Sequence, residues 1–311
     1  MGARSVRITR SDFLTPPEFQ GREPDHHPAG RVGGARVELI HTGNETRMGT
    51  CYQQIPARVF PPFVFSHEQA ALLYLINLTA GLMDGDAHHY EVTAREGTRA
   101  IVTGQSATRV HPAQTSYATQ QWSVVAEEGA CLILLPGPVI PFRGSRYYQR
   151  ARAELAPGAR LIWGDIWFPG RYERGALSER FEFDRIVQDF EVRRNGVLAY
   201  RERFRWDGPW NAADVAWHFG DALACASLYV GGPIPDQLPD APPDVCRSLF
   251  PFENGDNCLR WCGPPASVTT DLVNLSLQLA ANWTVGPGAA PWWVASSSLA
   301  PNHWFSSFEH S

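Results

Sequence analysis

Glycine and proline punctuate this chain so densely that long helices have little room. The sequence contains 27 Gly and 25 Pro in 311 residues. Between these breaks lie short alternating or apolar runs such as Arg36 to Ile40, which are typical of β-strands. The spacing therefore predicts a mainly β fold.

A strand, a turn with a glycine, and a second strand recur along the middle of the chain. The turns are Glu127-Glu-Gly-Ala130, Ala156-Pro-Gly-Ala159 and Arg194-Asn-Gly196. Asn-Gly is a strong signal for a type I′ hairpin, because both central residues need positive φ. The repeat has a changing period, which favours a large sandwich or helicoid of stacked β-hairpin sheets over a propeller or a solenoid.

Helices are expected only near the C-terminal end. Residues 268–283 place Leu272, Leu275, Leu279 and Trp283 on one apolar stripe of a helix. A shorter helix is expected at about 235–248. Residues 1–30 lack periodicity and are expected to form a flexible lead-in to a single β-rich domain over 31–311.

Composition excludes several classes of function. The net charge of −5 offers no basic excess for nucleic acid, and the apolar run from Ala70 to Leu78 is too short to cross a membrane. With no apolar leader segment, we expect a cytoplasmic protein. All 27 basic residues are Arg, which favours fixed contacts with carboxylates. The six Cys are scattered, so idle thiols are the simplest interpretation.

Sequence motifs for catalysis are missing, since there is no G-x-S-x-G, Walker loop or H-E-x-x-H. The acidic turn from Gly81 to Asp86 offers oxygen ligands in Asp84 and Asp86, followed by His88 and His89. Those two histidines should point to opposite faces of a strand. A plain turn and a metal site therefore both remain open here.

Three further segments carry polar or rigid features. Thr103 to Arg109 reads as a strand face of hydroxyls and an amide, suited either to a wet cavity or to a hydrogen-bonded core. Leu135 to Phe142 holds three prolines, which suits a rigid interface or a plain sheet crossover. Gly164 to Gly175 carries Asp165, Arg171 and Glu173, where an Arg–carboxylate pair could position the loop.

Taken in order, these segments resemble the urease accessory protein family UreD, also called UreH. The family's landmarks are a Gly-Gly-x-x-x-Gly-Asp turn, a Thr-x-Gln-x-x-Thr-Lys strand, a Leu-Pro-x-Pro-x-Ile-Pro-Phe loop and a Gly-Arg-x-x-x-Gly-Glu loop. Here they are similar to Ala80 to Asp86, Thr103 to Arg109, Leu135 to Phe142, and Gly170 to Gly175. The sequence departs from them at Ala80, Arg109 and Ala176, and Glu179 is a candidate replacement for the missing Glu.

The resemblance implies a non-catalytic scaffold without a tightly bound cofactor. Its expected partners are the urease apoprotein, UreF and, through UreF, the GTPase UreG, and the complex is expected to be able to form a dimer. The scaffold would pass transient Ni²⁺ toward the urease active site, with Asp86 and Asp165 as metal contacts. The implied structural or passage residues are Gly81, Gly85, Gln105, Thr108, Gly170, Arg171 and Gly175, and the implied interface residues are Pro136, Pro138, Pro141 and Phe142. The alternatives are a diverged metal-dependent enzyme using Asp84, Asp86 and His88 or His89, or a binding module that does not serve urease.

Overall fold

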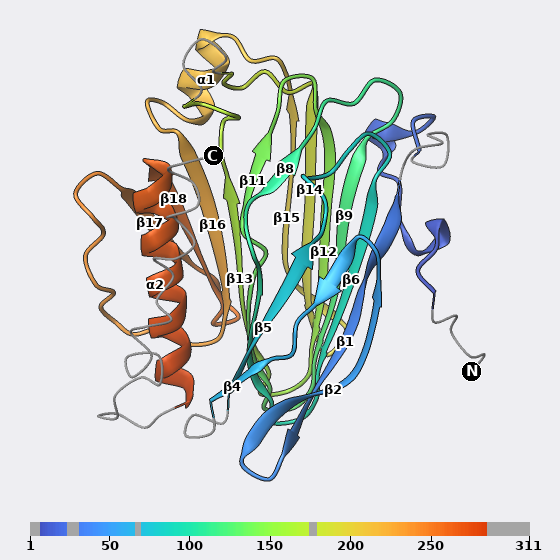
Figure 1. The fold of residues 1–311 in the computed structure, drawn as a ribbon. Helices are drawn as coiled ribbons and strands as arrows, with labels where there is room; N and C mark the ends of the chain where they lie inside the picture. Colours follow the sequence, from blue (N-terminus) through green and yellow to red (C-terminus); the bar gives the residue numbers. More distant parts are fainter. Residues whose placement is uncertain (1–6, 24–30, 66–69, 174–178, 285–311) are drawn as a thin grey trace.

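The computed structural model describes residues 7–23, 31–65, 70–173 and 179–284, which form two stacked β-sheets with a long helix on one outer face (Figure 1). Sheet A has the strand order β15 (Val197–Asp207), β14 (Arg185–Arg194), β12 (Arg146–Leu155), β9 (Ala118–Ala126), β6 (Ala87–Ala94), β1 (Val32–Thr42) and β2 (Glu45–Gln54). Sheet B has the order β17 (Cys246–Pro251), β18 (Asn257–Gly263), β16 (Ala224–Gly231), β13 (Arg160–Trp167), β10 (Cys131–Leu135), β7 (Arg99–Gly104), β5 (Ala70–Asn77) and β3 (Ala57–Val59), with β4 (Phe63–Phe65), β8 (Thr108–Val110) and β11 (Pro138–Pro141) alongside. The helices are α1 (Ala212–His218) and α2 (Pro265–Thr284), with short 3₁₀ turns η1 (Arg10–Asp12) and η2 (Pro17–Phe19). The predicted mainly β fold is confirmed.

Tight glycine turns send the chain from one sheet to the other. At 127–130 the Ala130 amide donates to the Glu127 carbonyl over 3.0 Å, and Gly129 adopts a φ of +67°. The turn joins β9 of sheet A to β10 of sheet B, and the turn at 156–159 likewise joins β12 to β13. Strands within the middle of each sheet are consequently parallel, as in β6–β9–β12 and β5–β7–β10–β13.

The hairpin interpretation is therefore wrong at two of the three turns. The chain passes back and forth between two sheets, so the large sandwich or helicoid that the sequence favoured is confirmed, but without hairpins at these two turns. At Asn195-Gly196 the prediction is confirmed, because β14 and β15 pair antiparallel and both turn residues have positive φ. A parallel pair cannot be closed by a two-residue loop, so each parallel neighbour here is reached through the other sheet.

Helix α2 covers the outer face of sheet B (Figure 1). Leu272, Leu275 and Leu279 are buried against residues of β16 and β18, which confirms that part of the apolar stripe. The helix begins at Pro265, three residues before the expected start, since proline is tolerated in the first turn. The helix expected at 235–248 is absent from the described structure there. Prolines interrupt this segment, and β17 begins at Cys246.

The sequence did not predict helix α1 or the docking of the N-terminal region. Asn211 caps α1 by accepting hydrogen bonds from the amides of Ala213 and Asp214. In the segment expected to be a flexible lead-in, residues 7–23 lie along sheet A, and Phe19 is buried against Tyr117 at a ring distance of 4.3 Å. Phe19 therefore holds the N-terminal segment against sheet A.

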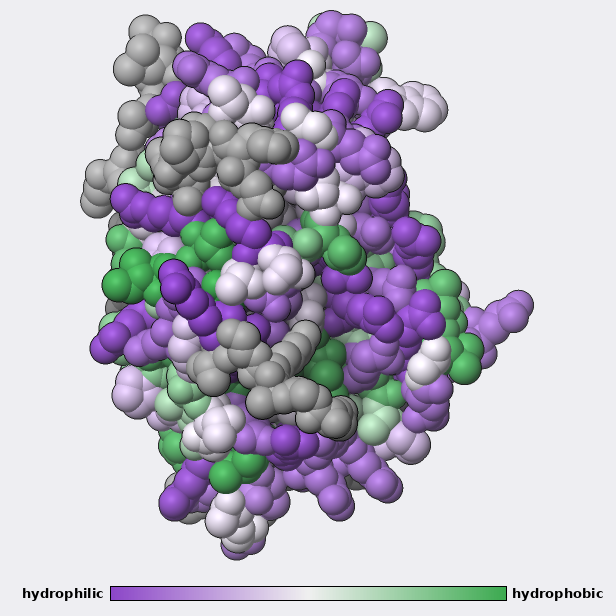
Figure 2. Space-filling view, turned by 90° about the vertical axis from the view of Figure 1, so that its right-hand side faces the viewer, coloured by the Kyte–Doolittle hydropathy of each residue, from purple (hydrophilic) through white to green (hydrophobic). Residues whose placement is uncertain are grey.

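Ion pairs cross the solvent-facing side of sheet A. Arg95 reaches Glu38 and Glu127, each at 2.5 Å, and Arg36 reaches Glu91 at 2.9 Å. Hydrophilic residues correspondingly cover most of the face in Figure 2. The all-Arg composition thus serves the carboxylate contacts that the sequence indicated. Among the described residues, no helix is long and apolar enough to span a bilayer.

Candidate functional site

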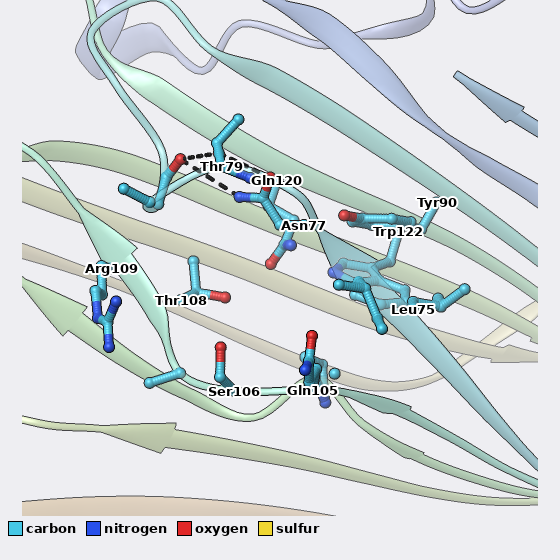
Figure 3. Close-up of a pocket in the computed structure, with 16 residues that line it drawn as sticks. Leu75, Asn77, Thr79, Tyr90, Gln105, Ser106, Thr108, Arg109, Gln120 and Trp122 are labelled. Carbon is cyan, nitrogen blue, oxygen red and sulfur yellow. Dashed lines mark hydrogen bonds between the residues drawn. The ribbon is translucent and has the colours of Figure 1, made fainter. Parts of the chain in front are cut away.

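Segments that the sequence singled out as separate motifs meet at the C-terminal ends of neighbouring strands in sheet B. Strands β5, β7 and β10 run parallel, so the loops after them emerge side by side. They enclose a first cavity of about 60 Å³ (Figure 3). Its lining residues are Leu75, Ile76, Asn77, Thr79, Ala80, Gly81, Tyr90, Gly104, Gln105, Ser106, Ala107, Thr108, Arg109, Gln120, Trp122 and Pro136.

At these strand ends, two glycines let the backbones of neighbouring loops approach one another. A Cβ on Gly81, which has a φ of +143°, would lie 2.4 Å from the Arg109 carbonyl oxygen. A Cβ on Gly104 would lie 2.4 Å from the Pro136 carbonyl oxygen. Both contacts are shorter than any side chain tolerates. Both glycines are therefore required by the backbone geometry, and the sequence had not singled out Gly104.

A second, wider cavity of about 390 Å³ adjoins the first, and Ala80 and Arg109 line both. Its remaining lining residues are His111, Ile140, Phe142, Phe168, Gly170, Arg171, Tyr172 and Glu173. Gly170 and Arg171 therefore line a cavity together with residues of the first three motifs. Gly175 and Ala176 lie outside the described residues.

An arginine–carboxylate pair positions the Gly170–Arg171 segment. The Arg171 Nε atom donates to Glu179 over 2.7 Å, and its guanidinium stacks 4.2 Å from the centroid of Phe142. Burial alone would raise the pKa of Glu179, but the hydrogen bond from Arg171 and the charge of Arg143 hold it below its usual range. Glu179, the candidate replacement that the sequence offered, therefore pairs with Arg171.

A chain of buried polar groups leads from the first cavity into the space between the sheets. The Tyr147 hydroxyl lies 3.3 Å from the Oε1 atoms of both Gln120 and Gln149. Gln149 and Gln188 then donate to the two oxygens of Asp165, over 2.5 and 2.7 Å. Gln120 also lines the first cavity. The series of hydrogen-bonded side chains therefore starts at that cavity and ends at Asp165.

Asp165 is a buried carboxylate surrounded by neutral donors. Its side chain is 3% exposed, and Trp163 Nε1 supplies a further hydrogen bond of 2.7 Å. Burial raises the pKa of Asp165 to about 7, although the hydrogen bonds from Trp163, Gln149 and Gln188 oppose that rise. The group can therefore gain or lose a proton near neutral pH.

His88 adds an imidazole to the same layer. Its Cα pairs with that of Gln120, which pairs in turn with Gln149, and Gln149 pairs with Gln188. The four side chains thus form one row across sheet A. The His88 ring is fully buried, and neither nitrogen has a hydrogen-bond partner within the described residues. Burial lowers its pKa to about 4, so the ring is neutral at pH 7.

Asp84 and Asp86 are engaged elsewhere. Asp86 accepts hydrogen bonds from the amides of Arg31 and Met83, over 2.8 and 2.9 Å, and burial raises its pKa. Asp84 accepts from the amides of residues 114–116. Asp86 lines neither of the two cavities and holds its own turn, where Gly85 has a φ of +81°.

The metal site that the alternative enzyme would need does not assemble from these residues. His88 points between the sheets, whereas His89 lies on the other face, 3.3 Å from Ser123, as the alternation of a strand requires. Within the described ranges, no group of three or more His, Cys, Asp or Glu side chains is arranged to hold a metal ion.

The proline segment lies mainly inside the protein. Pro138 and Pro141 bound β11, which pairs with β8 and β13, and Pro136 and Phe142 are buried as well. This arrangement favours the sheet crossover over an exposed interface. Pro136 and Phe142 each still form part of a cavity wall.

The polar row was not found from the sequence, although a signal exists. His88, Gln120 and Gln188 each precede an inward aromatic residue by two positions, namely Tyr90, Trp122 and Phe190. The pattern becomes visible only when the parallel register is known.

The family comparison gives the geometry a context. The profile described as UreD urease accessory protein matches residues 31–270. The chain belongs to the UreD family. Similar proteins include UreD 2 of Streptomyces griseus, 32% identical over 171 residues, or 54% of this chain and 57% of that protein. UreD 3 of Methylorubrum populi is 37% identical over 196 residues, covering 62% and 60%. UreD of Sporosarcina pasteurii is 28% identical over 159 residues, covering 50% and 61%.

In each of these comparisons the chain spans less than two thirds of the relative's length. The resemblance drawn from the four motifs is confirmed.

Proposed function

We propose that this UreD chain is a non-catalytic scaffold that binds the urease apoprotein and the accessory proteins UreF and UreG during nickel insertion. The match to the UreD family over residues 31–270 carries this proposal. Transient handling of nickel, rather than tight storage, is part of this proposal.

We further propose that Ni²⁺ passes the protein through the first cavity and the polar chain behind it. Gln105 and Thr108 stand at the cavity, and Asp165 lies at the inner end of the hydrogen-bonded chain. Amide and carboxylate oxygens bind a divalent ion weakly enough to release it, as conduction requires. The neutral ring of His88 adds one nitrogen donor to the same layer. Asp86 is assigned to its turn and not to the passage.

The test is urease activation in cells that lack their own UreD and receive this chain instead. Asp165→Asn keeps the size of the side chain and removes its charge. We expect at least a tenfold loss of urease activity per enzyme, about 1.4 kcal/mol or more in the transfer step, with matching loss of nickel in purified urease. Asp86→Asn is the matched control, because it alters a buried carboxylate that belongs to neither the cavities nor the hydrogen-bonded series that ends at Asp165.

Both variants must accumulate and co-purify with urease as the unaltered chain does. Equal activity losses for Asp86→Asn and Asp165→Asn would contradict the assigned passage. Failure of the unaltered chain to activate urease with compatible UreF and UreG would contradict the scaffold role itself. A stoichiometric metal held by the purified chain, together with turnover of its own, would instead identify an enzyme.

A further inference from the structure

Three cysteines stand in register at the far edge of sheet B. Cys225 on β16 pairs with Cys262 on β18, and Cys262 pairs with Cys246 on the edge strand β17. All three are free thiols. They lie far apart in the sequence, and only the antiparallel pairing of these strands aligns them.

The register gives both cysteine pairs the geometry of a cross-strand disulfide. Residues directly opposite each other in antiparallel strands have Cα atoms about 4.5 or 5.5 Å apart and point to the same face. A disulfide needs Cα atoms about 4.4 to 6.8 Å apart. Leu259 and Trp261 of β18 face helix α2, so Cys262, the next residue, points to the opposite face.

The members of the row differ in accessibility. Cys246 is exposed, and Cys262 is partly buried. Cys225 packs against the aromatic cluster that contains Trp206 and Trp210. Burial, with Cys262 beside it, holds the pKa of Cys225 well above its usual range. Because the thiolate is the nucleophile, this burial makes Cys225 a poor attacking group.

We propose that Cys246 and Cys262 form a reversible disulfide that ties the edge strand β17 to β18. Glutathione disulfide is a sufficient oxidant. The Cys246 thiolate attacks it and releases one glutathione thiolate, which leaves glutathione bonded to Cys246. The Cys262 thiolate then attacks the Cys246 sulfur and releases the second glutathione. Two protein thiols are oxidised and one glutathione disulfide is reduced to two glutathiones.

This site is independent of the role in urease maturation and uses none of the cavity residues. A metal is a weaker candidate for the same thiols, because no cluster of three or more metal-ligating side chains occurs in the described parts of the chain. The disulfide would hold β17, which has a neighbouring strand on only one side within the described structure, to that neighbour.

The test is peptide mapping of the full chain after incubation with glutathione disulfide at low protein concentration. Cleavage before aspartate separates the row, since Cys225 falls in peptide 221–235, Cys246 in 244–255 and Cys262 in 256–270. We expect a link between the last two peptides in the monomer, and its loss after dithiothreitol. Cys246→Ser and Cys262→Ser should both remove the link.

Cys51→Ser is the matched control, because Cys51 is also exposed but has Val37 opposite it. This variant should keep the link. A link to peptide 221–235 would overturn the pairing in favour of Cys225. A link that survives in Cys262→Ser would assign it to Cys258, which shares the peptide. Glutathione left on Cys246 without any link would refute the disulfide.

Discussion

Two layers of the space between the sheets differ in chemistry, although the same strands supply both. The apolar layer contains Tyr90, Trp122, Ala151 and Phe190 from sheet A, with Trp163 from sheet B. The polar layer contains His88, Gln120, Gln149 and Gln188, with Asp165 opposite. Every polar member lies two positions from an apolar member on its own strand.

Side chains two residues apart share a face of a strand, so both layers lie between the same two sheets. The apolar layer stabilises the fold through buried area and ring packing, such as Trp122 against Trp163 at 5.7 Å. The polar layer costs free energy wherever a group is unsatisfied, as at His88 and at the Gln188 Oε1 atom in the described structure. The comparison therefore separates a layer that holds the protein together from a layer that costs stability and that the proposed cation passage would use.

The largest loss of unfolding free energy is expected when a large side chain of the apolar layer is truncated. Trp122→Ala removes a side chain that is only 2% exposed, and should cost about 3–5 kcal/mol of unfolding free energy. Urea unfolding followed by circular dichroism measures it. Trp122→Phe is the control, because the indole nitrogen has no partner within the described residues. If the phenylalanine variant lost as much as the alanine variant, packing area would not explain the layer.

The next largest expected effect is on the pH dependence of stability, and it arises in the polar layer. In the folded chain the pKa of Asp165 is raised from 3.8 to about 7, so between these values the folded state binds more protons than the unfolded state. Its contribution to stability falls as pH rises through that window, by about 4 kcal/mol at roughly 1.4 kcal/mol per unit. The pKa of His88 is lowered from 6.5 to about 4, so its contribution rises with pH, by about 3 kcal/mol.

These two slopes nearly cancel in the unaltered chain and should appear in single variants. Asp165→Asn leaves the His88 contribution, so stability should fall as pH decreases from 6.5 to 4. His88→Leu leaves the Asp165 contribution, so stability should fall as pH rises from about 4 to 7. Urea unfolding across this range compares the variants. If the unfolding free energy changed with pH in the same direction in both variants, Asp165 and His88 would not have the opposite contributions assigned to them.

The sequence predicted local features better than the layers. The turn at Asn195-Gly196 was predicted because its backbone requirement is local. The turn at 127–130 was also recognised, but local chemistry does not say which sheet the next strand joins, and a hairpin was wrongly expected. The motifs around Gly81, Gln105 and Arg171 were found in order. The row from His88 to Gln188 was not, since it depends on register between strands far apart in sequence.

The smallest change in stability is expected at the mouth of the first cavity, where the side chains are exposed. Gln105→Ala should alter the unfolding free energy by no more than about 0.5 kcal/mol, because the side chain is exposed and makes no contact on which the core depends.

If the polar layer conducts an ion, however, the residues at its entrance should influence delivery without influencing the fold. Urease activation in cells should therefore fall for Gln105→Ala, by less than for Asp165→Asn. Gln20→Ala, also exposed but outside both cavities, should leave activation unchanged. Equal activation by the two glutamine variants would confine any role in delivery to the buried layer and remove Gln105 from the passage.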